Sequence, residues 1–360
     1  MARTALLAAG GTGGHLFPAQ ALADELRRRG WTVHLAVDER ADRFAGDFPG
    51  EVHIVPSATI GSKNPVALLK TFLTLGRGYR RAKEVIRTIE PHVVVGFGGY
   101  PTLPPLTAAR SAGVPRVLHE QNAVMGRANR LLAKRVDAVA TGFPLVSKAP
   151  VETTVTGNPL RLLAHDAAKS AYPALAESGD FALTVFGGSQ GARYFADTVP
   201  EALVHLAEGQ RKRLVLTMQA RAEDIERVEA ALDRLGVRGE VKDFFGDMPA
   251  RIAASHLVIC RSGASSVAEL SLIGRPSVLV PFPGALDDDQ GHNAAVLEEA
   301  GGAVLRRQRD LGAKALGALI GELMDNAGRL SEMAASAKSA GIDDASARLA
   351  DLVERVAKPA

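Results

Sequence analysis

The 360-residue sequence has a single cysteine, Cys260, no long apolar run and little excess charge. One cysteine excludes a disulfide framework or a cysteine-based zinc site, and its place after an apolar run indicates a small buried hydrophobe. No stretch reaches the roughly 18 consecutive apolar residues that a membrane-spanning helix needs. The amino terminus lacks a basic segment followed by an apolar core, so no secretory signal is expected. These absences predict a cytoplasmic protein that can still rest on a membrane.

The formal net charge is only +3, with 46% apolar and 23% charged residues. This composition is ordinary for a globular enzyme, and nothing in it calls for a nucleic-acid partner. The slight basic excess is compatible with attraction to an anionic membrane surface. A chain of 360 residues is too long for one comfortable core, so two domains of about 150 to 190 residues are expected.

Two glycine-rich turns stand out against this ordinary background. The first occupies residues 10–15 (GGTGGH) and the second residues 187–192 (GGSQGA). Each follows a short apolar run and precedes a helical pattern, which is how an α/β sheet presents amide N–H groups to a phosphate or sugar. Two such turns, each opening a half of similar size, predict a pair of α/β domains facing each other across a cleft.

Short apolar runs alternate with helical patterns along both halves. Strands are predicted at 4–9, 32–37, 53–55, 92–96, 116–118, 153–156, 181–186, 213–217, 256–260 and 277–280. With helices between them, this alternation is typical of parallel, doubly wound sheets. The segment 143–159 is rich in Pro, Gly and Thr and predicts an inter-domain connection near residues 158–160. Residues 330–356 are predicted to be helical.

His15 follows the first glycine turn, at the start of a predicted helix. The helix dipole at that end disfavours the imidazolium form, so a neutral ring can accept a proton. Beside a sugar-binding cleft, such a ring suits a general base that activates a hydroxyl. The alternative, equally weighted on spacing alone, is a histidine that only caps the turn.

A second polar group, HEQN at residues 119–122, follows the predicted strand 116–118. Open α/β sheets bind ligands at the carboxyl ends of their strands. Together with Asn129, this loop is therefore interpreted as a surface that recognises hydroxyls. In the alternative interpretation, Glu120 and Asn122 only cap the following helix.

In the second half, residues 261–266 (RSGASS) follow a predicted strand and begin a helix that bears Glu269. Small residues there leave N–H groups open for a diphosphate, and Glu269 can accept two hydrogen bonds from a ribose diol. A plain capping box between Ser266 and Glu269 is the alternative, and both can hold. The acids at 287–289 are interpreted as helix-start residues suited to the dipole, so no metal site is expected.

The segment 65–87 mixes apolar and basic side chains. The apolar members are Leu68, Leu69, Phe72, Leu73 and Leu75, and the neighbouring cations are Lys63, Lys70, Arg77, Arg80, Arg81 and Lys83. Apolar anchors beside cations suit a helix or loop that rests on anionic lipid. The pattern alone nevertheless favours an ordinary helix whose leucines pack into the domain.

Together these motifs resemble one family from end to end, the MurG family of bacterial peptidoglycan glycosyltransferases. Seven ordered blocks carry the resemblance: GGTGGHLFPA near the start, GFGGYPT at 96–102, HEQNAVMGRANRLL from His119, TGNPLR from Thr156, FGGSQGAR from Phe186, CRSGASSVAEL from Cys260 and DQGHNA from Asp289. The resemblance implies a GT-B fold, with two Rossmann-like domains facing across a cleft. It also implies docking on the cytoplasmic membrane face through the apolar and basic segment 65–87.

The implied reaction moves N-acetylglucosamine from UDP-N-acetylglucosamine to the C4 hydroxyl of the muramoyl sugar of lipid I. Lipid I is an undecaprenyl-diphosphate-linked acceptor, and the inverting transfer gives the β-1,4-linked product lipid II. The implied domains are an acceptor and membrane domain (1–158), a donor domain (159–340) and a carboxyl-terminal helix (341–360) that packs back toward the first domain. No cofactor is expected.

The expected roles fall on three groups of residues, of which the donor contacts are carried over from the resemblance. His15 is the expected catalytic base. The expected donor-binding residues are Thr12, Gly13, Gly14, Asn122, Arg161, Ser189, Ala264, Ser265, Ser266, Glu269 and Gln290. The expected acceptor-binding residues are His119, Glu120 and Asn129. Some members carry paired glutamines where this chain has Asp289-Gln290, so only Gln290 is carried over.

Three rival functions follow from the same residues. Asp38, after the second predicted strand, stands where a nicotinamide oxidoreductase would have a ribose-binding acid. Neither glycine turn, however, fits G-x-G-x-x-G. A UDP-sugar 2-epimerase shares the two-domain architecture and would leave the membrane segment without a role. A non-catalytic membrane scaffold would bind vesicles and release no UDP.

Overall fold

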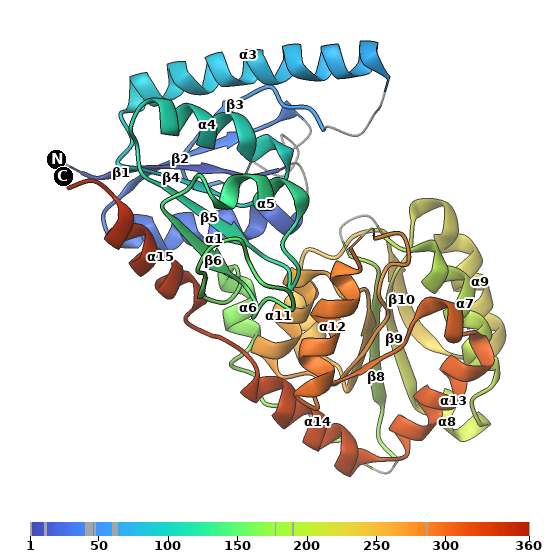
Figure 1. Ribbon diagram of the computed structural model, residues 1–360. Helices are drawn as coiled ribbons and strands as arrows, with labels where there is room; N and C mark the ends of the chain where they lie inside the picture. The colour runs from blue at the N-terminus through green and yellow to red at the C-terminus, as the bar shows by residue number, and fades with distance from the viewer. Residues whose placement is uncertain are drawn as a thin grey trace. The chain divides into compact units, whose positions relative to one another are not determined.

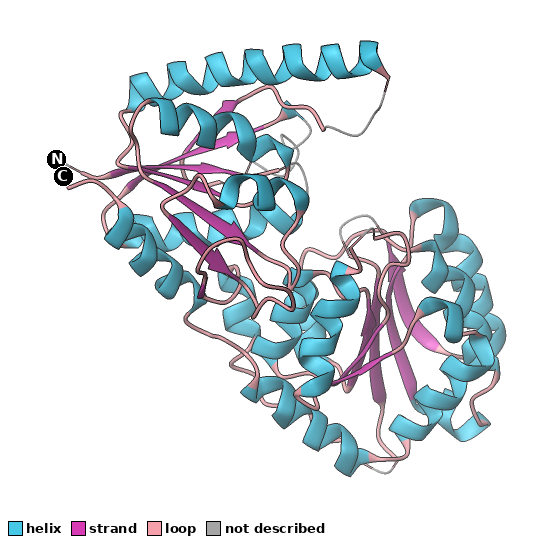
Figure 2. Cartoon of the chain, in the orientation of Figure 1, coloured by secondary structure: helices cyan, strands magenta, loops and turns pink. Residues whose placement is uncertain are grey.

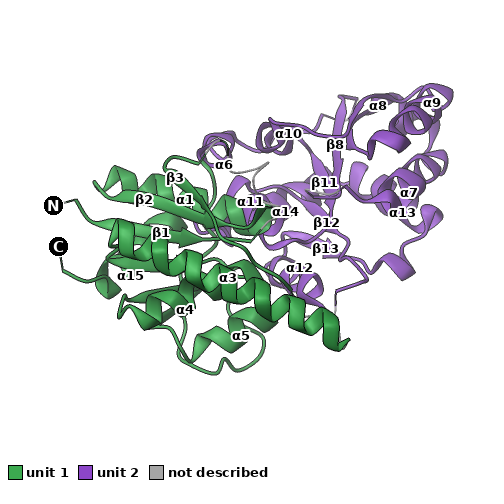
Figure 3. Cartoon of the chain, turned by 90° about the horizontal axis from the view of Figure 1, so that it is seen from above, with its two compact units in different colours: residues 1–161, 344–360 green, residues 162–343 purple. Residues whose placement is uncertain are grey.

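The computed structural model describes residues 2–10, 13–39, 46, 48–59, 64–176, 178–188, 191–285 and 287–359. The chain divides into two compact units (Figure 3). Unit 1 comprises residues 1–161 and 344–360, and unit 2 comprises residues 162–343. Each unit is a sheet with helices on both faces (Figure 2).

Unit 1 contains a seven-stranded parallel sheet in the order β3-β2-β1-β4-β5-β6-β7. Its strands are β1 (Thr4–Ala8), β2 (Thr32–Val37), β3 (Glu51–Ile54), β4 (Val93–Gly96), β5 (Arg116–Glu120), β6 (Ala138–Thr141) and β7 (Thr154–Val155). The central strands are apolar on both faces because helices cover both sides, as a parallel sheet requires.

The helices of unit 1 form two layers, and each layer encloses a separate core (Figure 1). They are α1 (Gly13–Arg28), α3 (Pro65–Ile89), α4 (Leu103–Ser111), α5 (Arg127–Ala133) and α15 (Ala345–Val356), with a 3₁₀ turn at Tyr100–Thr102. Helices α1 and α15 pack on one face, where Leu349 and Val353 of α15 join Leu22 and Leu26 of α1. Helices α3 and α4 pack together on the opposite face.

Helix α15 is fixed to unit 1 by polar contacts as well as by apolar packing. The Arg29 guanidinium bonds to Asp351 and Glu354, at 2.6 and 2.7 Å. The Trp31 indole N–H donates to Glu354 at 3.0 Å. The last helix of the sequence therefore belongs to the same unit as the first strand, and both chain ends lie in unit 1 (Figure 1).

Unit 2 contains a six-stranded parallel sheet in the order β10-β9-β8-β11-β12-β13. Its strands are β8 (Phe181–Phe186), β9 (Leu214–Gln219), β10 (Arg238–Lys242), β11 (Leu257–Cys260), β12 (Ser277–Leu279) and β13 (Ala303–Leu305). Its helices are α6 (Leu162–Ala167), α7 (Arg193–Val204), α8 (Glu208–Arg213), α9 (Ile225–Leu235), α10 (Met248–Ala254), α11 (Ala264–Ile273), α12 (Asp289–Glu299), α13 (Ala313–Met324) and α14 (Ala327–Ser339), with 3₁₀ turns at Ala222–Asp224 and Gln308–Asp310.

The prediction of two doubly wound parallel-sheet domains is confirmed. Sequence patterns missed β6, β10 and β13, which are three to five residues long and, in β10, mostly polar. The helix predicted at 330–356 is two helices, α14 and α15, separated near Gly341. Cys260 is fully buried, as predicted, and burial raises the pKa of its thiol.

Candidate active site

Both glycine-rich turns follow a strand at which the order of the sheet reverses. In unit 1, β2 and then β3 follow on one side of β1, and β4 to β7 follow in order on its other side. In unit 2, β8 has the same place between β9 and β11. Ligands of open α/β sheets bind at such switch points, beyond the carboxyl ends of the strands. The topology therefore gives each unit one binding edge, opened by its glycine turn.

His15 is the third residue of α1 and lies half-buried at the unit 1 edge. The backbone of three glycines surrounds its ring. A Cβ added to Gly10, Gly98 or Gly99 would lie 3.3 to 3.6 Å from ring atoms of His15. Gly98 and Gly99 also have positive φ angles, 87° and 75°, that other residues rarely adopt. The GFGGYPT loop is thus shaped to bring bare backbone against His15.

Side chains from the HEQN segment contact the Nδ1 side of the His15 ring. Nδ1 of His15 is 3.1 Å from Oε1 of Gln121, and Nε2 of Gln121 is 3.1 Å from Nδ1 of His119. Nε2 of His119 is 3.0 Å from the carbonyl oxygen of Gly157. His119 is fully buried, which lowers the pKa of its ring to about 4. A direct contact of His119 with an acceptor, as expected from the sequence, does not fit this burial.

The buried carboxylate of Glu120 holds the loop that follows β5. It accepts hydrogen bonds from the backbone N–H groups of Asn122 and Gly126 and from the side-chain amides of Asn122 and Asn129. Glu120 and Asn129 are only 2% and 3% exposed. Helix α5 begins later, at Arg127, after Gly126 as N-cap, so a capping role for Glu120 and Asn122 at that helix is wrong.

At the unit 2 edge, the second glycine turn leads into α7. A Cβ on Gly187 would lie 2.2 Å from the backbone nitrogen of Ala192, so the turn closes only around glycine. The N–H of Gly187 donates to Oε1 of Gln219, at the end of β9. Within the described part of the chain, no side chain caps α7, whose N-cap residue is Ala192. Its first N–H groups are therefore open to an anion.

Helix α11 offers a second uncapped start beside it, after β11. The helix begins at Ala264 with Gly263 as N-cap and no side-chain capping bond, so the proposed Ser266–Glu269 capping box is wrong. Both residues are partly buried on the first turns of α11. The hydroxyl of Ser265 is buried and has no hydrogen-bond partner among the described residues. Open N–H groups and this hydroxyl together suit an anionic ligand.

Gln290 is fixed at the start of α12 by hydrogen bonds to neighbouring loops. Its Oε1 accepts from the N–H of Phe282, and its carbonyl accepts from the hydroxyl of Ser262, at 3.0 and 2.8 Å. Asp288, the N-cap residue, has a positive φ of 48° and bonds twice to the guanidinium of Arg307. That pairing lowers the pKa of Asp288. The acid thus serves the local helix start.

The remaining expected site residues lie in different places. Gly13 and Gly14 form the first residues of α1. Arg161 is the last residue of unit 1 before unit 2 begins, and its guanidinium stacks 4.0 Å from the ring centre of Phe17. Thr12 and Ser189 lie outside the described residues.

Helix α3 leaves apolar side chains exposed along its amino-terminal half. Leu69, Phe72 and Leu73 are 56% to 61% exposed, whereas Val85 and Ile86 farther along the helix are buried. The alternative in which these leucines pack into the domain is therefore wrong for Leu69 and Leu73. Lys70, Arg77, Arg80, Arg81 and Lys83 are exposed on the same helix, and Lys63 lies outside the described residues. Among the described residues, no helix is both long enough and apolar enough to cross a membrane.

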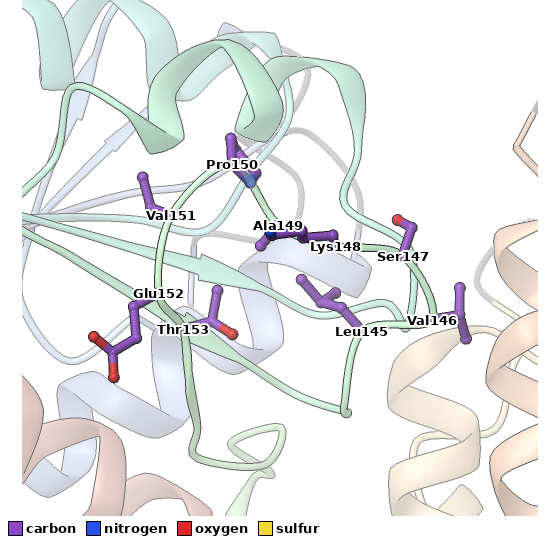
Figure 4. A pocket seen from close by; sticks show the side chains of 9 residues that line it. All are labelled: Leu145, Val146, Ser147, Lys148, Ala149, Pro150, Val151, Glu152 and Thr153. Carbon is purple, nitrogen blue, oxygen red and sulfur yellow. The ribbon is translucent and has the colours of Figure 1, made fainter.

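A pocket of about 580 Å³ lies elsewhere in unit 1, at the loop that connects β6 to β7. One consecutive loop, residues 145–153, lines it (Figure 4). The loop contributes Lys148 and Glu152 among small and aliphatic side chains. None of the residues expected from the sequence to act in binding or catalysis belongs to this loop, so the pocket is not the candidate site.

Comparison with known families accounts for both units. Residues 5–141 match the N-terminal domain of glycosyltransferase family 28, and residues 182–349 match its C-terminal domain. The first match spans β1 to β6 and the first glycine turn, and the second spans β8 to β13 and the second glycine turn and extends into α15.

Curated relatives and a solved structure give the same result over nearly the whole chain. A protein of Mesorhizobium japonicum named UDP-N-acetylglucosamine--N-acetylmuramyl-(pentapeptide) pyrophosphoryl-undecaprenol N-acetylglucosamine transferase is 59% identical over 98% of this chain and 95% of its own length. A protein of the same name from Allorhizobium ampelinum is 56% identical over the same shares. The crystal structure of MurG from Acinetobacter baumannii matches 99% of this chain and 100% of its own, with a TM-score of 0.78 and 28% identity. The chain therefore belongs to the MurG N-acetylglucosamine transferases of glycosyltransferase family 28.

Proposed function

We propose that this enzyme transfers N-acetylglucosamine from UDP-N-acetylglucosamine to the muramoyl C4 hydroxyl of lipid I, forming lipid II. The observation that carries the proposal is the identity of 53% to 59% over 98% of the chain to transferases named for this reaction. The two glycine turns at the switch points of two parallel sheets agree with a sugar-nucleotide reaction.

In the proposed mechanism, His15 is the general base. The acceptor hydroxyl loses its proton to the His15 ring while its oxygen forms the bond to C1 of the donor sugar. The bond from C1 to the UDP oxygen breaks on the opposite face, and UDP leaves with the electron pair. A half-buried histidine at a helix start, flanked by bare glycine backbone, supports this role because a hydroxyl can approach its ring.

On the donor side, we assign UDP-N-acetylglucosamine to unit 2. The uncapped starts of α7 and α11 present N–H groups that stabilise the charge developing on the departing diphosphate. Ala264, Ser265 and Ser266 are assigned to the phosphates and Glu269 to the ribose. Gln290, held by the N–H of Phe282, is assigned to the sugar hydroxyls. Gly13, Gly14, Asn122 and Arg161, together with Thr12 and Ser189, complete the proposed donor contacts.

On the acceptor side, we assign lipid I to unit 1. Glu120 and Asn129 shape this surface rather than project from it, because each is almost completely buried. Their proposed contribution is to hold the loop 120–129 in the form that meets the acceptor.

We further propose that α3 rests on the cytoplasmic face of the membrane as a peripheral contact. Three exposed apolar side chains, Leu69, Phe72 and Leu73, would enter the headgroup region, and the neighbouring cations would meet anionic lipid. This contact would bring unit 1 to a lipid-linked acceptor.

One assay tests the activity directly. Radiolabelled UDP-N-acetylglucosamine is incubated with the enzyme, with and without lipid I, and with EDTA as a second variable. Labelled lipid II should form only when lipid I is present. Consumption of the nucleotide sugar without lipid I would instead support the epimerase, and no consumption in either case would support the scaffold. The oxidoreductase is excluded by membership of a glycosyltransferase family over both units.

A further inference from the structure

The side chains behind His15 form a chain of hydrogen bonds in which every proton can be assigned. It runs from Nδ1 of His15 to Oε1 of Gln121, from Nε2 of Gln121 to Nδ1 of His119, and from Nε2 of His119 to the Gly157 carbonyl, at 3.1, 3.1 and 3.0 Å. His119 and Gln121 are 0% and 2% exposed, so water does not compete for these contacts.

The direction of the chain follows from its buried end. A carbonyl oxygen can only accept, so Nε2 of His119 must carry a hydrogen. Because burial lowers the pKa of this ring to about 4, the ring is neutral near pH 7 and its Nδ1 is an acceptor. The Gln121 amide must therefore turn its NH₂ group toward His119. The same NH₂ group also lies 3.3 Å from the carbonyl oxygen of His119, which requires the same orientation.

With the amide fixed in this way, Oε1 of Gln121 faces His15 and can only accept. Nδ1 of His15 must then carry the hydrogen, and a neutral ring has only one. Its lone pair is left on Nε2, on the side of the ring that faces Gly99, where an added Cβ would lie 3.6 Å from that nitrogen. Nε2 is thus the atom available to a substrate hydroxyl.

We propose that Gln121 and His119 are positioning residues that hold His15 in the Nδ1–H tautomer, with Nε2 free to accept the proton. The inference rests on the proposed role of His15 as base. When Nε2 takes the hydroxyl proton, Nδ1 keeps its bond to the Gln121 carbonyl oxygen throughout. An amide fixes the tautomer without adding a negative charge, so the ring can release the captured proton afterwards.

The first test observes the tautomer without any turnover. Long-range ¹H–¹⁵N correlation spectra of the substrate-free enzyme distinguish protonated from unprotonated ring nitrogens, and the His15→Ala spectrum assigns the His15 signals. A protonated Nδ1 and an unprotonated Nε2 are expected at pH 7.5. The opposite tautomer would overturn the proposal. If the tautomer is as expected but His15→Ala retains full turnover, the relay stands and the base assignment fails.

The second test separates positioning from mere structural support. In Gln121→Leu the His15 tautomers should mix and kcat should fall roughly 10- to 100-fold, with little change in the donor KM. In Gln121→Glu a carboxylate would stabilise the imidazolium, so the acidic limb of the pH–rate profile should move to higher pH. A pH profile of Gln121→Glu identical to that of the wild type would contradict the relay.

His119 has its own matched pair of variants. His119→Asn keeps an acceptor near the position of Nδ1, whereas His119→Phe keeps the ring and removes the acceptor. The asparagine variant should retain at least about ten times more turnover than the phenylalanine variant, and it should keep the His15 tautomer. Equal losses in two variants that remain folded would assign His119 a packing role only.

A separate cluster in unit 1 carries a second proposal. His34 of β2 lies opposite Glu51 of β3, and His53 is two residues further along β3, on the same face of the sheet. Nδ1 of His34 is 3.0 Å from Nε2 of His53 and 3.6 Å from a carboxylate oxygen of Glu51. Among the described residues, this is the group whose possible ligand atoms all lie within 4.8 Å of one another.

Zinc bonds of about 2.0 to 2.1 Å in a tetrahedral site place neighbouring ligand atoms roughly 3.3 Å apart. The distances from Nδ1 of His34 to His53 and to Glu51, 3.0 and 3.6 Å, lie on either side of that value, and the strand pairing places the three residues together. We infer that these residues bind one divalent transition metal ion, with zinc as the best match to two imidazoles and a carboxylate. On binding, the hydrogen that lies between the two rings would move to the other nitrogen of its own ring, so that each neutral ring offers a lone pair to the metal.

Zinc titrated into the full-length, metal-free enzyme tests this site, with the heat of binding as the readout. The wild type should bind one equivalent, and His34→Ala and His53→Ala should each weaken binding roughly 10- to 100-fold. His205→Ala, which removes an exposed histidine of unit 2, should have no effect. Equal zinc affinity in the wild type and His34→Ala would overturn the proposal.

Discussion

In unit 1, side chains that follow β1 and β5 form hydrogen bonds to one another. In unit 2, no described side chain caps the helices α7 and α11, which follow β8 and β11. Both units have the same sheet topology, and both edges lie at its switch point. The same architecture thus supports two kinds of chemistry. Fixed side chains suit the movement of a proton, and open backbone N–H groups suit the binding of an anion.

The largest effect expected from this contrast is the loss of turnover in His15→Ala. Turnover should fall about 10²- to 10⁴-fold because the variant lacks the proposed base. UDP affinity, measured by calorimetry, should stay unchanged because His15 is not among the residues assigned to the donor. His165→Ala, a histidine of α6, is the matched control. Near-normal turnover in His15→Ala would remove it from the role of base.

A second substitution changes the glycine turn of unit 2 and leaves the hydrogen bonds of His15 in unit 1 unchanged. In Gly187→Ala the new Cβ would lie 2.2 Å from the nitrogen of Ala192, so the turn must open, at a strain of about 1 to 3 kcal/mol. UDP affinity should fall about 5- to 150-fold, while the His15 tautomer stays unchanged. Gly209→Ala in α8 is the control, because its Cβ would meet nothing within 4 Å. Unchanged UDP affinity would separate this turn from donor binding.

Sequence patterns were sufficient for most of the fold because the buried strands of a parallel sheet are continuous apolar runs. The strands at 32–37 and 181–186 have the predicted bounds. Strands β6, β10 and β13 were missed because runs of three to five residues have no distinctive period, and β10 (RGEVK) is largely polar.

The site was harder to predict for a different physical reason. A sequence shows that His119, Glu120 and Gln121 follow a strand, but it does not show which side chains point inward. Alternation along an extended chain could have suggested that His119 and Gln121 share one face. The bond from His119 to Gly157 joins residues 38 positions apart and has no local signal.

A third prediction concerns α3, where unit 1 has an exposed apolar surface beside cations. In Leu69→Asp combined with Phe72→Asp, two side chains that are 61% and 60% exposed become charged. Binding to vesicles with anionic lipid should fall roughly tenfold or more, because insertion of the side chains is lost and the new charges repel the surface. Stability should change little. Val204→Asp, at an exposed apolar residue of unit 2, should bind vesicles like the wild type. Equal binding by all three proteins would exclude α3 as the membrane contact.

The smallest predicted effect is a pH dependence specific to unit 1. Burial lowers the pKa of His119 to about 4, below the value near 6.5 of an unfolded chain, so the unfolded state binds more protons between these values. Stability from this ring is therefore present above about pH 6.5 and is lost as the pH falls toward 4. Between pH 7.5 and 6.0 the loss is about 0.8 kcal/mol.

The single tryptophan, Trp31, is buried in unit 1, and its fluorescence reports the urea unfolding of that unit. His119→Asn should lose about 0.8 kcal/mol less than the wild type over this interval, because other histidines titrate equally in both proteins. Equal losses of stability in the two proteins would mean that the His119 ring binds protons equally in the folded and unfolded chain. The neutral His119 ring, from which the direction of the hydrogen bonds to Gln121 and His15 is derived, would then be wrong.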